Sequence, residues 1–192
     1  LKYADHAQKV WPAERLSIGG GAYAVSRTYV ALASYAPDKA LQIPENTSEP
    51  RFILYRNYAR GEAFLLRGDV AGARGELKAL GKVMGGGGMP ELVIAKNVLA
   101  GRIAMAEGNP KKAAKLFEDA AKVQEARLAD SWDPPGWWYP VRRSAAAAHL
   151  KAGDYLKAQA EAEKSLTGWK HDPLALWVKG KAQASLGKTA DS

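Results

Sequence analysis

Residues 61–77 read GEAFLLRGDVAGARGEL and place a Gly-Asp step, Gly68-Asp69, between two helix-forming runs. A glycine just past a helix end adopts the left-handed conformation that closes the helix. An Asp or Asn after it caps the next helix through its side-chain oxygen. The step therefore predicts a tight turn inside a pair of antiparallel helices.

This step recurs along the chain as Gly108-Asn109 and Gly153-Asp154, with a weaker version at Gly187-Lys188. The turn glycines lie 108 − 68 = 40, 153 − 108 = 45 and 187 − 153 = 34 residues apart. Helix pairs repeated at such spacings indicate a solenoid, in which each pair packs on its neighbours. We therefore predict an all-α fold built from antiparallel helix pairs.

Proline, glycine and polar clusters divide the chain into a leading part and an array of pairs. Residues 1–50 are expected to hold a helical remnant and a linker, with helices within 2–10 and 22–34 and one short helical turn in the loop 37–50. Residues 51–192 hold the repeats, at about 51–84, 91–128 and 140–172, with a partial one at 173–187. Because the chain begins at Leu1, we expect an excised domain, a processed form or a fragment.

Small and large residues stand at fixed distances from each turn glycine, and this pattern resembles the tetratricopeptide repeat family. The residues that carry it are Gly61, Phe64, Ala73, Leu77 and Leu80; Gly101, Ala104, Ala113, Phe117 and Ala120; and Ala146, His149, Ala158, Ala162 and Ser165. The stretch 133–142, DPPGWWYPVR, further resembles a loop of uncharacterised bacterial tetratricopeptide proteins. The resemblance implies a right-handed superhelix and a C-terminal part of a longer bacterial protein.

Composition is that of a soluble globular protein, with 47% hydrophobic and 25% charged residues and no apolar run of membrane-spanning length. Cysteine is absent, which excludes disulfides and thiolate chemistry but leaves the compartment open, cytoplasmic or, after removal of a signal peptide, periplasmic. The net charge of +8 falls in residues 51–192, which carry 23 basic and 15 acidic side chains. An acidic partner and ordinary solvated helix faces are both compatible with this excess.

The sequence holds no convergent catalytic set, so we expect no enzyme, cofactor or metal. Of the three histidines, His149 falls at a packing position, and His6 and His171 stand in no ligand-like spacing. Neither Gly85–Gly88 nor the Leu186–Thr189 stretch satisfies a phosphate-binding loop. The cations form no dense block, which disfavours nucleic acid.

The resemblance also implies a concave groove lined by the first helix of each pair, aromatic at one end and basic at the other. Its candidate partner-binding residues are Tyr55, Tyr58, Arg102, Arg143, Trp177 and Lys181, with Glu62, Leu66, Val98, Met105, Ala147 and Lys151 beside them. Such a groove suits an acidic, hydrophobic peptide or helix. The leading hypothesis is therefore a non-enzymatic scaffold that binds another protein.

A second cluster of aromatic residues lies in the loop 129–139, with Trp132, Trp137, Trp138 and Tyr139. These rings either pack one repeat on the next, which we favour, or form a platform for a small ligand. Self-association is a further alternative, because the last helix carries Leu174, Leu176, Trp177 and Val178 without a second helix after it.

Overall fold

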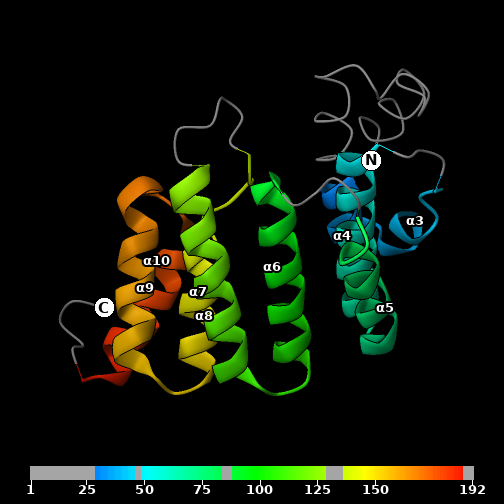
Figure 1. The fold of residues 1–192 in the computed structure, drawn as a ribbon. Helices are drawn as coiled ribbons and strands as arrows, with labels where there is room; N and C mark the ends of the chain where they lie inside the picture. Colours follow the sequence, from blue (N-terminus) through cyan, green and yellow to red (C-terminus); the bar gives the residue numbers. More distant parts are fainter. Residues whose placement is uncertain (1–28, 46–48, 84–87, 129–135, 188–192) are drawn as a thin grey trace. The chain divides into compact units, whose positions relative to one another are not determined.

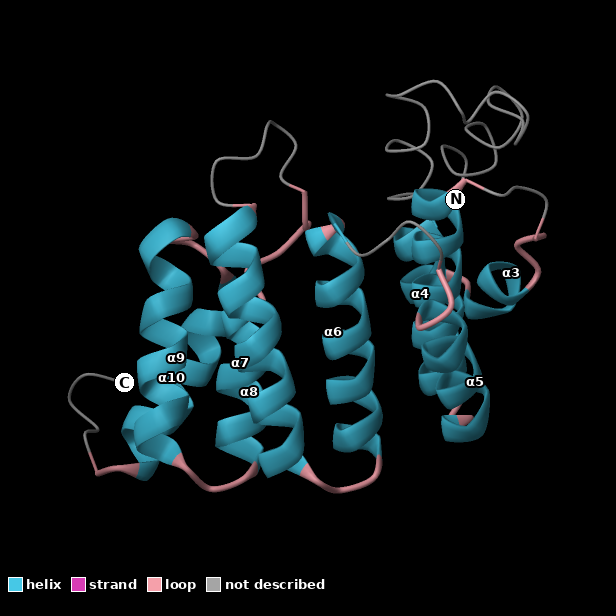
Figure 2. Ribbon diagram, viewed as in Figure 1, coloured by secondary structure: helices cyan, strands magenta, loops and turns pink. Residues whose placement is uncertain are grey.

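The computed structural model describes residues 29–45, 49–83, 88–128 and 136–187 (Figure 1). All regular structure in these ranges is helical, with no strand among them (Figure 2). The prediction of an all-α fold is therefore confirmed. The chain divides into two compact units, residues 1–99 and 100–192.

The helices agree with the predicted pairs to within a few residues. The first unit contains a helix over 29–35, α3 (Pro37–Leu41), α4 (Pro50–Leu66), α5 (Val70–Leu80) and the greater part of α6 (Pro90–Ala106). The second contains the end of α6, α7 (Pro110–Arg127), α8 (Arg142–Lys151), α9 (Tyr155–Gly168) and α10 (Pro173–Ser185). The expected helix over 2–10 and the start of the expected helix over 22–34 lie outside the described residues.

The turn glycines all adopt the left-handed conformation, with φ of 77° at Gly68, 73° at Gly108, 77° at Gly153 and 78° at Gly187. At the first turn, the Asp69 amide donates to the Phe64 carbonyl at 2.8 Å, which closes α4. The Asp69 carboxylate then accepts from the Gly72 amide at 2.8 Å and caps α5. Asn109 and Asp154 cap α7 and α9 in the same way. One short step thus ends one helix and starts the next, as predicted.

The residues at the repeat positions form the core where the paired helices meet. Thirteen of these fifteen residues are buried, and Phe64 and Leu77 are half-buried. Two glycines show why small residues are needed. A Cβ atom on Gly61 would come within 2.5 Å of the Leu99 side chain, and one on Gly101 within 2.6 Å of the Phe117 ring. These glycines therefore allow a large side chain to lie directly against the helix backbone.

The short helix α3 and the helix over 29–35 pack against α4 in the first unit. Their core includes Tyr29, Leu32, Ala40 and Ile43, which cluster with Phe52 of α4. The rings of Tyr29 and Phe52 meet edge to face at 5.2 Å between centroids. The expected linker before residue 50 is therefore partly helical and contributes to the core. None of the helices in the described ranges combines the length and the apolarity that a bilayer span requires.

Candidate functional site

Two of the predicted groove residues lie in the interior. Tyr55 is 2% exposed and Tyr58 is 1% exposed, so neither ring is presented to a partner. The expectation that they anchor a bound peptide would require a rearrangement that exposes them, because both rings are buried in this structure. Val98, expected beside them in the groove, is also completely buried.

The Arg143 side chain contacts other residues of the second unit. Its Nη1 donates to Asp172 Oδ2 at 2.7 Å, and its guanidinium lies over the Tyr139 ring at 4.2 Å from the centroid. Asp172 is buried and caps α10 through its other oxygen, which accepts from the Ala175 amide at 2.8 Å. Arg143 therefore positions α10 on α8, and its charge is largely neutralised in place.

The described rings of the aromatic loop, Trp137, Trp138 and Tyr139, pack against one another and are buried or half-buried. Trp137 and Trp138 stack at 4.0 Å between ring centroids, and Tyr139 contacts both rings. Trp137 and Tyr139 are buried, and Trp138 is half-buried. Gln124 of α7 holds the loop by accepting from the Val141 amide at 2.8 Å and donating to the Tyr139 carbonyl at 2.9 Å. These contacts support the packing role that we favoured, and Trp132 lies outside the described residues.

A buried arginine that the sequence analysis did not single out ties three helices together. Arg142 of α8 donates twice to Glu125 of α7, both at 2.6 Å, and once to Glu161 of α9 at 2.7 Å. The hydrogen bonds to Glu125, opposed by burial and reinforced by Glu161, raise the pKa of Arg142. Burial alone would raise the pKa of Glu161, but the hydrogen bonds from Lys164 and Arg142 outweigh burial and lower it.

His149 also has a structural role, as its packing position predicted. It is buried in α8, and its Nε2 lies 2.6 Å from Glu118 Oε1 of α7. Its Nδ1 lies 3.8 Å from the Asp154 carboxylate at the α8–α9 turn. Within the described ranges, no group of three or more His, Asp or Glu side chains is arranged to hold a metal ion.

One side of α10 remains exposed and carries two of the predicted groove residues, Trp177 and Lys181. Leu174, Trp177 and Lys181 are spaced by three and four residues, so they share one side of the helix. We call these three residues the α10 stripe. Leu174 is 39% exposed, Trp177 is 54% exposed, and Lys181 is exposed. The adjoining side of α10 is buried against α8 and α9 through Ala175, Val178 and Ala182.

Residues 136–187 expose both apolar and basic side chains. Within the parts of the chain that the structure describes, eight large hydrophobic side chains are exposed, and five of them lie between residues 156 and 177: Leu156, Trp169, Leu174, Leu176 and Trp177. All four acidic side chains of residues 136–187 are engaged in ion pairs, as Asp154–Lys157, Glu161–Arg142, Glu163–Lys179 and Asp172–Arg143. Lys151, Lys170 and Lys181 form no ion pair with any residue in the described ranges. Residues 136–187 therefore expose lysines without an ion-pair partner in the described ranges as well as large apolar side chains.

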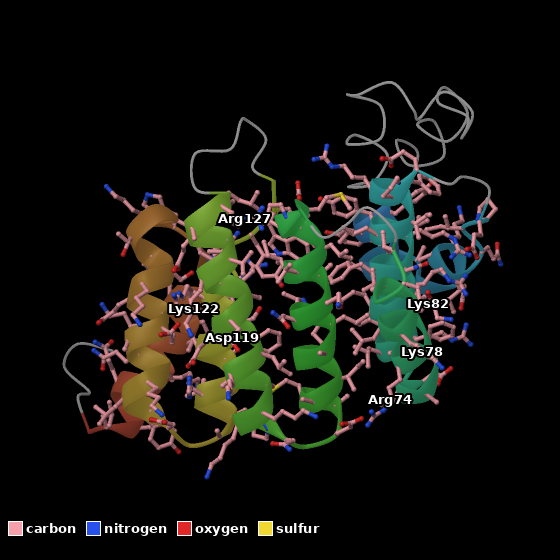
Figure 3. The ribbon with its side chains drawn as sticks, viewed as in Figure 1. Arg74, Lys78, Lys82, Asp119, Lys122 and Arg127 are labelled. Carbon is pink, nitrogen blue, oxygen red and sulfur yellow. The ribbon has the colours of Figure 1, made fainter. Side chains whose placement is uncertain are left out.

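A second basic feature, which the sequence analysis also missed, runs along α5 and past its end in the first unit. Arg74, Lys78 and Lys82 follow one another at intervals of four residues and are all exposed (Figure 3). The acidic residue of α5, Glu76, is buried and pairs with Arg60 at 2.6 Å, so it does not neutralise this row. Intervals of four residues in the sequence are the signal that would have found it.

Comparisons of the chain with family models, with curated proteins and with solved structures found no match. The fold therefore defines the class, an all-α protein of antiparallel helix pairs, and the membership of the tetratricopeptide family stays a prediction.

Proposed function

We propose that this protein is a non-enzymatic interaction module of the tetratricopeptide type, and that it binds an acidic, amphipathic helix or peptide along the α10 stripe. The observation that carries the proposal is the exposed indole of Trp177, one turn from Lys181, on a helix whose adjoining side is buried. Helix pairs of this kind commonly serve as scaffolds for extended binding surfaces.

The apolar part of the stripe supplies the binding free energy. Tryptophan is enriched among the residues that dominate interfaces, because it buries a large rigid area at a small cost in conformational entropy. Trp177 and Leu174 are both more than one third exposed, so both have surface left to bury. An apolar residue of the partner that covers Trp177 would remove this surface from water.

The lysines define the charge of the partner. Lys151, Lys170 and Lys181 belong to the last three helices and their turns, where each acidic side chain already has a basic partner. Carboxylates on the partner would complement these charges, which accelerates association and selects against basic competitors. The basic row on α5 has the same sign, so both units favour an acidic partner.

The same charges argue against the alternative of self-association through this surface. Two copies that met along the α10 stripe would bring their lysines together, and like charges in contact cost free energy. Sedimentation at increasing concentration distinguishes the two ideas. We expect a monomer throughout, whereas a mass that rises with concentration and is restored to the monomer by Trp177→Ala would favour self-association.

An array of immobilised helical peptides tests the proposal. Each peptide has the same apolar face, and its flanking positions carry Glu, Gln or Lys. We expect the protein to be retained by the Glu series, and Trp177→Ala to abolish retention. Leu156→Ala is the matched control, because Leu156 is also exposed but lies on α9 outside the stripe. Equal retention by the three series, or equal loss in both variants, would refute the assignment.

A further inference from the structure

A glycine on α10 leaves the helix backbone open where two other helix pairs are closely packed. Gly61, Gly101 and Gly180 occupy the same position in their pairs, because each stands seven residues before a turn glycine (68 − 61, 108 − 101 and 187 − 180). A Cβ atom added at Gly61 or Gly101 would come within 2.6 Å of a neighbouring side chain. One added at Gly180 meets no heavy atom of the described residues within 4 Å.

The side chains that pack over the first two glycines show what this position accepts. Over Gly61 lies Leu99 of α6, and over Gly101 lies the Phe117 ring of α7. Both are large apolar side chains from a neighbouring helix that lie directly against the backbone. The third pair has Ala146 in place of glycine, and the buried residues that cluster with it are only alanines and Val178. A glycine at this position therefore goes together with a large apolar side chain from another helix.

Four residues of α10 surround the open position. Trp177, Gly180, Lys181 and Ala184 stand at i, i+3, i+4 and i+7, which is the spacing of four residues that form a hole for one side chain of a packed helix. We call these four residues the α10 hole. Trp177 is 54% exposed, and Lys181 and Ala184 are exposed as well. The two small residues leave the backbone accessible, while the indole and the lysine stem offer apolar surface at the other edge.

We propose that the α10 hole receives one leucine or phenylalanine side chain from the acidic helix that binds the α10 stripe. The inference rests on the function proposed above and adds the residue that the partner must carry. Trp177 and Lys181 belong to both the stripe and the hole, so one bound helix contacts both. A carboxylate one turn from the inserted side chain would reach Lys181, which fixes the register of the bound helix.

Titration of the 192-residue chain with three fluorescent helical peptides tests the proposal. The peptides carry the same Glu residues and differ at one central apolar position, which is Ala, Leu or Phe. We expect the Leu and Phe peptides to bind at least about tenfold more tightly than the Ala peptide, because only they fill the hole. Equal affinities that still depend on Trp177 would overturn the hole and leave the proposed function intact.

A filling substitution locates the inserted side chain. Gly180→Leu occupies the open position, and we expect it to remove the preference for Phe over Ala. Gly75→Leu is the matched control, because a Cβ atom on Gly75 of α5 also meets none of the described heavy atoms within 4 Å. A preference that persists in a Gly180→Leu protein with the circular dichroism of the wild type would overturn the location. A dimer that Gly180→Leu dissociates would identify a second copy as the occupant and overturn the proposal.

A thiol placed beside the hole tests it without a partner helix. The chain contains no cysteine, so Ala184→Cys introduces a single thiol. Helical side chains point toward the N-terminus, so a side chain at 184 leans toward residue 180. The variant is equilibrated with the disulfides of 2-phenylethanethiol and 2-mercaptoethanol, and mass spectrometry measures the ratio of the two adducts. Ala71→Cys is the control, because Ala71 is exposed on α5 among small and basic residues.

We expect the phenylethyl adduct to be favoured at residue 184 by at least about fivefold over its share at residue 71, because the hole buries the phenyl ring. Gly180→Leu should remove this excess. Equal ratios at the two thiols would overturn the hole whether or not the peptides bind. A phenylethyl excess without any peptide binding would support the hole and place the failure in the proposed acidic partner.

Discussion

Arg143 and Asp172 form an ion pair of 2.7 Å that joins α8 to the N-terminal end of α10. Asp172 also caps α10, with its other oxygen accepting from the Ala175 amide. A single buried carboxylate therefore both starts α10 and ties it to α8, which fixes the direction in which the α10 stripe is presented.

Substitution of Asp172 separates these two roles. Asp172→Ala removes the cap and the ion pair, and we expect the free energy of unfolding to fall by about 2 kcal/mol. Asp172→Asn keeps a capping oxygen, because asparagine caps helices as well as aspartate does, so it should cost about half as much. Urea denaturation measures both values. If the two variants are equally unstable, the cap contributes nothing.

The close packing at Gly101 gives a second prediction. A Cβ atom there would lie 2.6 Å from the buried Phe117 ring, so Gly101→Ala should destabilise the protein by about 1–3 kcal/mol despite its better helix propensity. At Gly180 nothing lies within 4 Å, and Gly180→Ala should stabilise by up to about 1 kcal/mol. Thermal denaturation of the pair tests this, and effects of the same sign would contradict the packing described here.

The left-handed turn at Gly153 gives a third prediction. With φ of 77°, an alanine at this position places its Cβ near the following carbonyl oxygen, which costs about 1–2 kcal/mol. Gly168 ends α9 without a left-handed φ, and a Cβ there meets nothing within 4 Å. Gly153→Ala should therefore lower the melting temperature, whereas Gly168→Ala should leave it unchanged or raise it. Equal shifts would exclude a conformational requirement at the turn.

The network around Arg142 makes stability depend on pH. The pKa of Glu161 is lower in the folded chain than in the unfolded chain, where a glutamate titrates near about 4.3. Its contribution is therefore complete above that pH and disappears as the pH falls through the folded-state value. We expect Glu161→Gln to destabilise at pH 7, and the difference from the wild type to shrink below about pH 4. A difference that persists undiminished in acid would contradict this.

An exposed ion pair serves as the control for that experiment. Asp119 and Lys122 lie on the surface of α7 at 3.0 Å (Figure 3), where water screens their attraction. Asp119→Asn should change the free energy of unfolding by less than about 0.5 kcal/mol at pH 7. A loss as large as that of Glu161→Gln would mean that burial is not the source of the difference.

The helix pairs could be predicted because their determinants are local. Gly68, Gly108 and Gly153 with the Asp or Asn that follows specify both helix ends, and they do so through backbone conformation and capping. The small residues Gly61 and Gly101 could be placed because the helix period fixes which side faces the partner helix.

The candidate site was harder to predict because it depends on which helix sides other elements cover. The resemblance to tetratricopeptide repeats placed Tyr55 and Tyr58 on a groove side but could not show that these side chains are buried. It assigned a charge to Arg143 but not the partner that neutralises it, since Asp172 lies 172 − 143 = 29 residues away. Trp177 and Lys181 belong to the last helix in the array, where less of the surface is covered, and both are exposed.

The most direct test of the proposed function is a charge exchange at Lys181, measured as the affinity of the full chain for two fluorescent helical peptides. The peptides share an apolar face and differ only in carrying Glu or Lys at the flanking positions. The account predicts that Lys181→Glu weakens binding of the Glu peptide about tenfold and strengthens binding of the Lys peptide by a similar factor. Affinities that do not depend on the charge at residue 181 would contradict it.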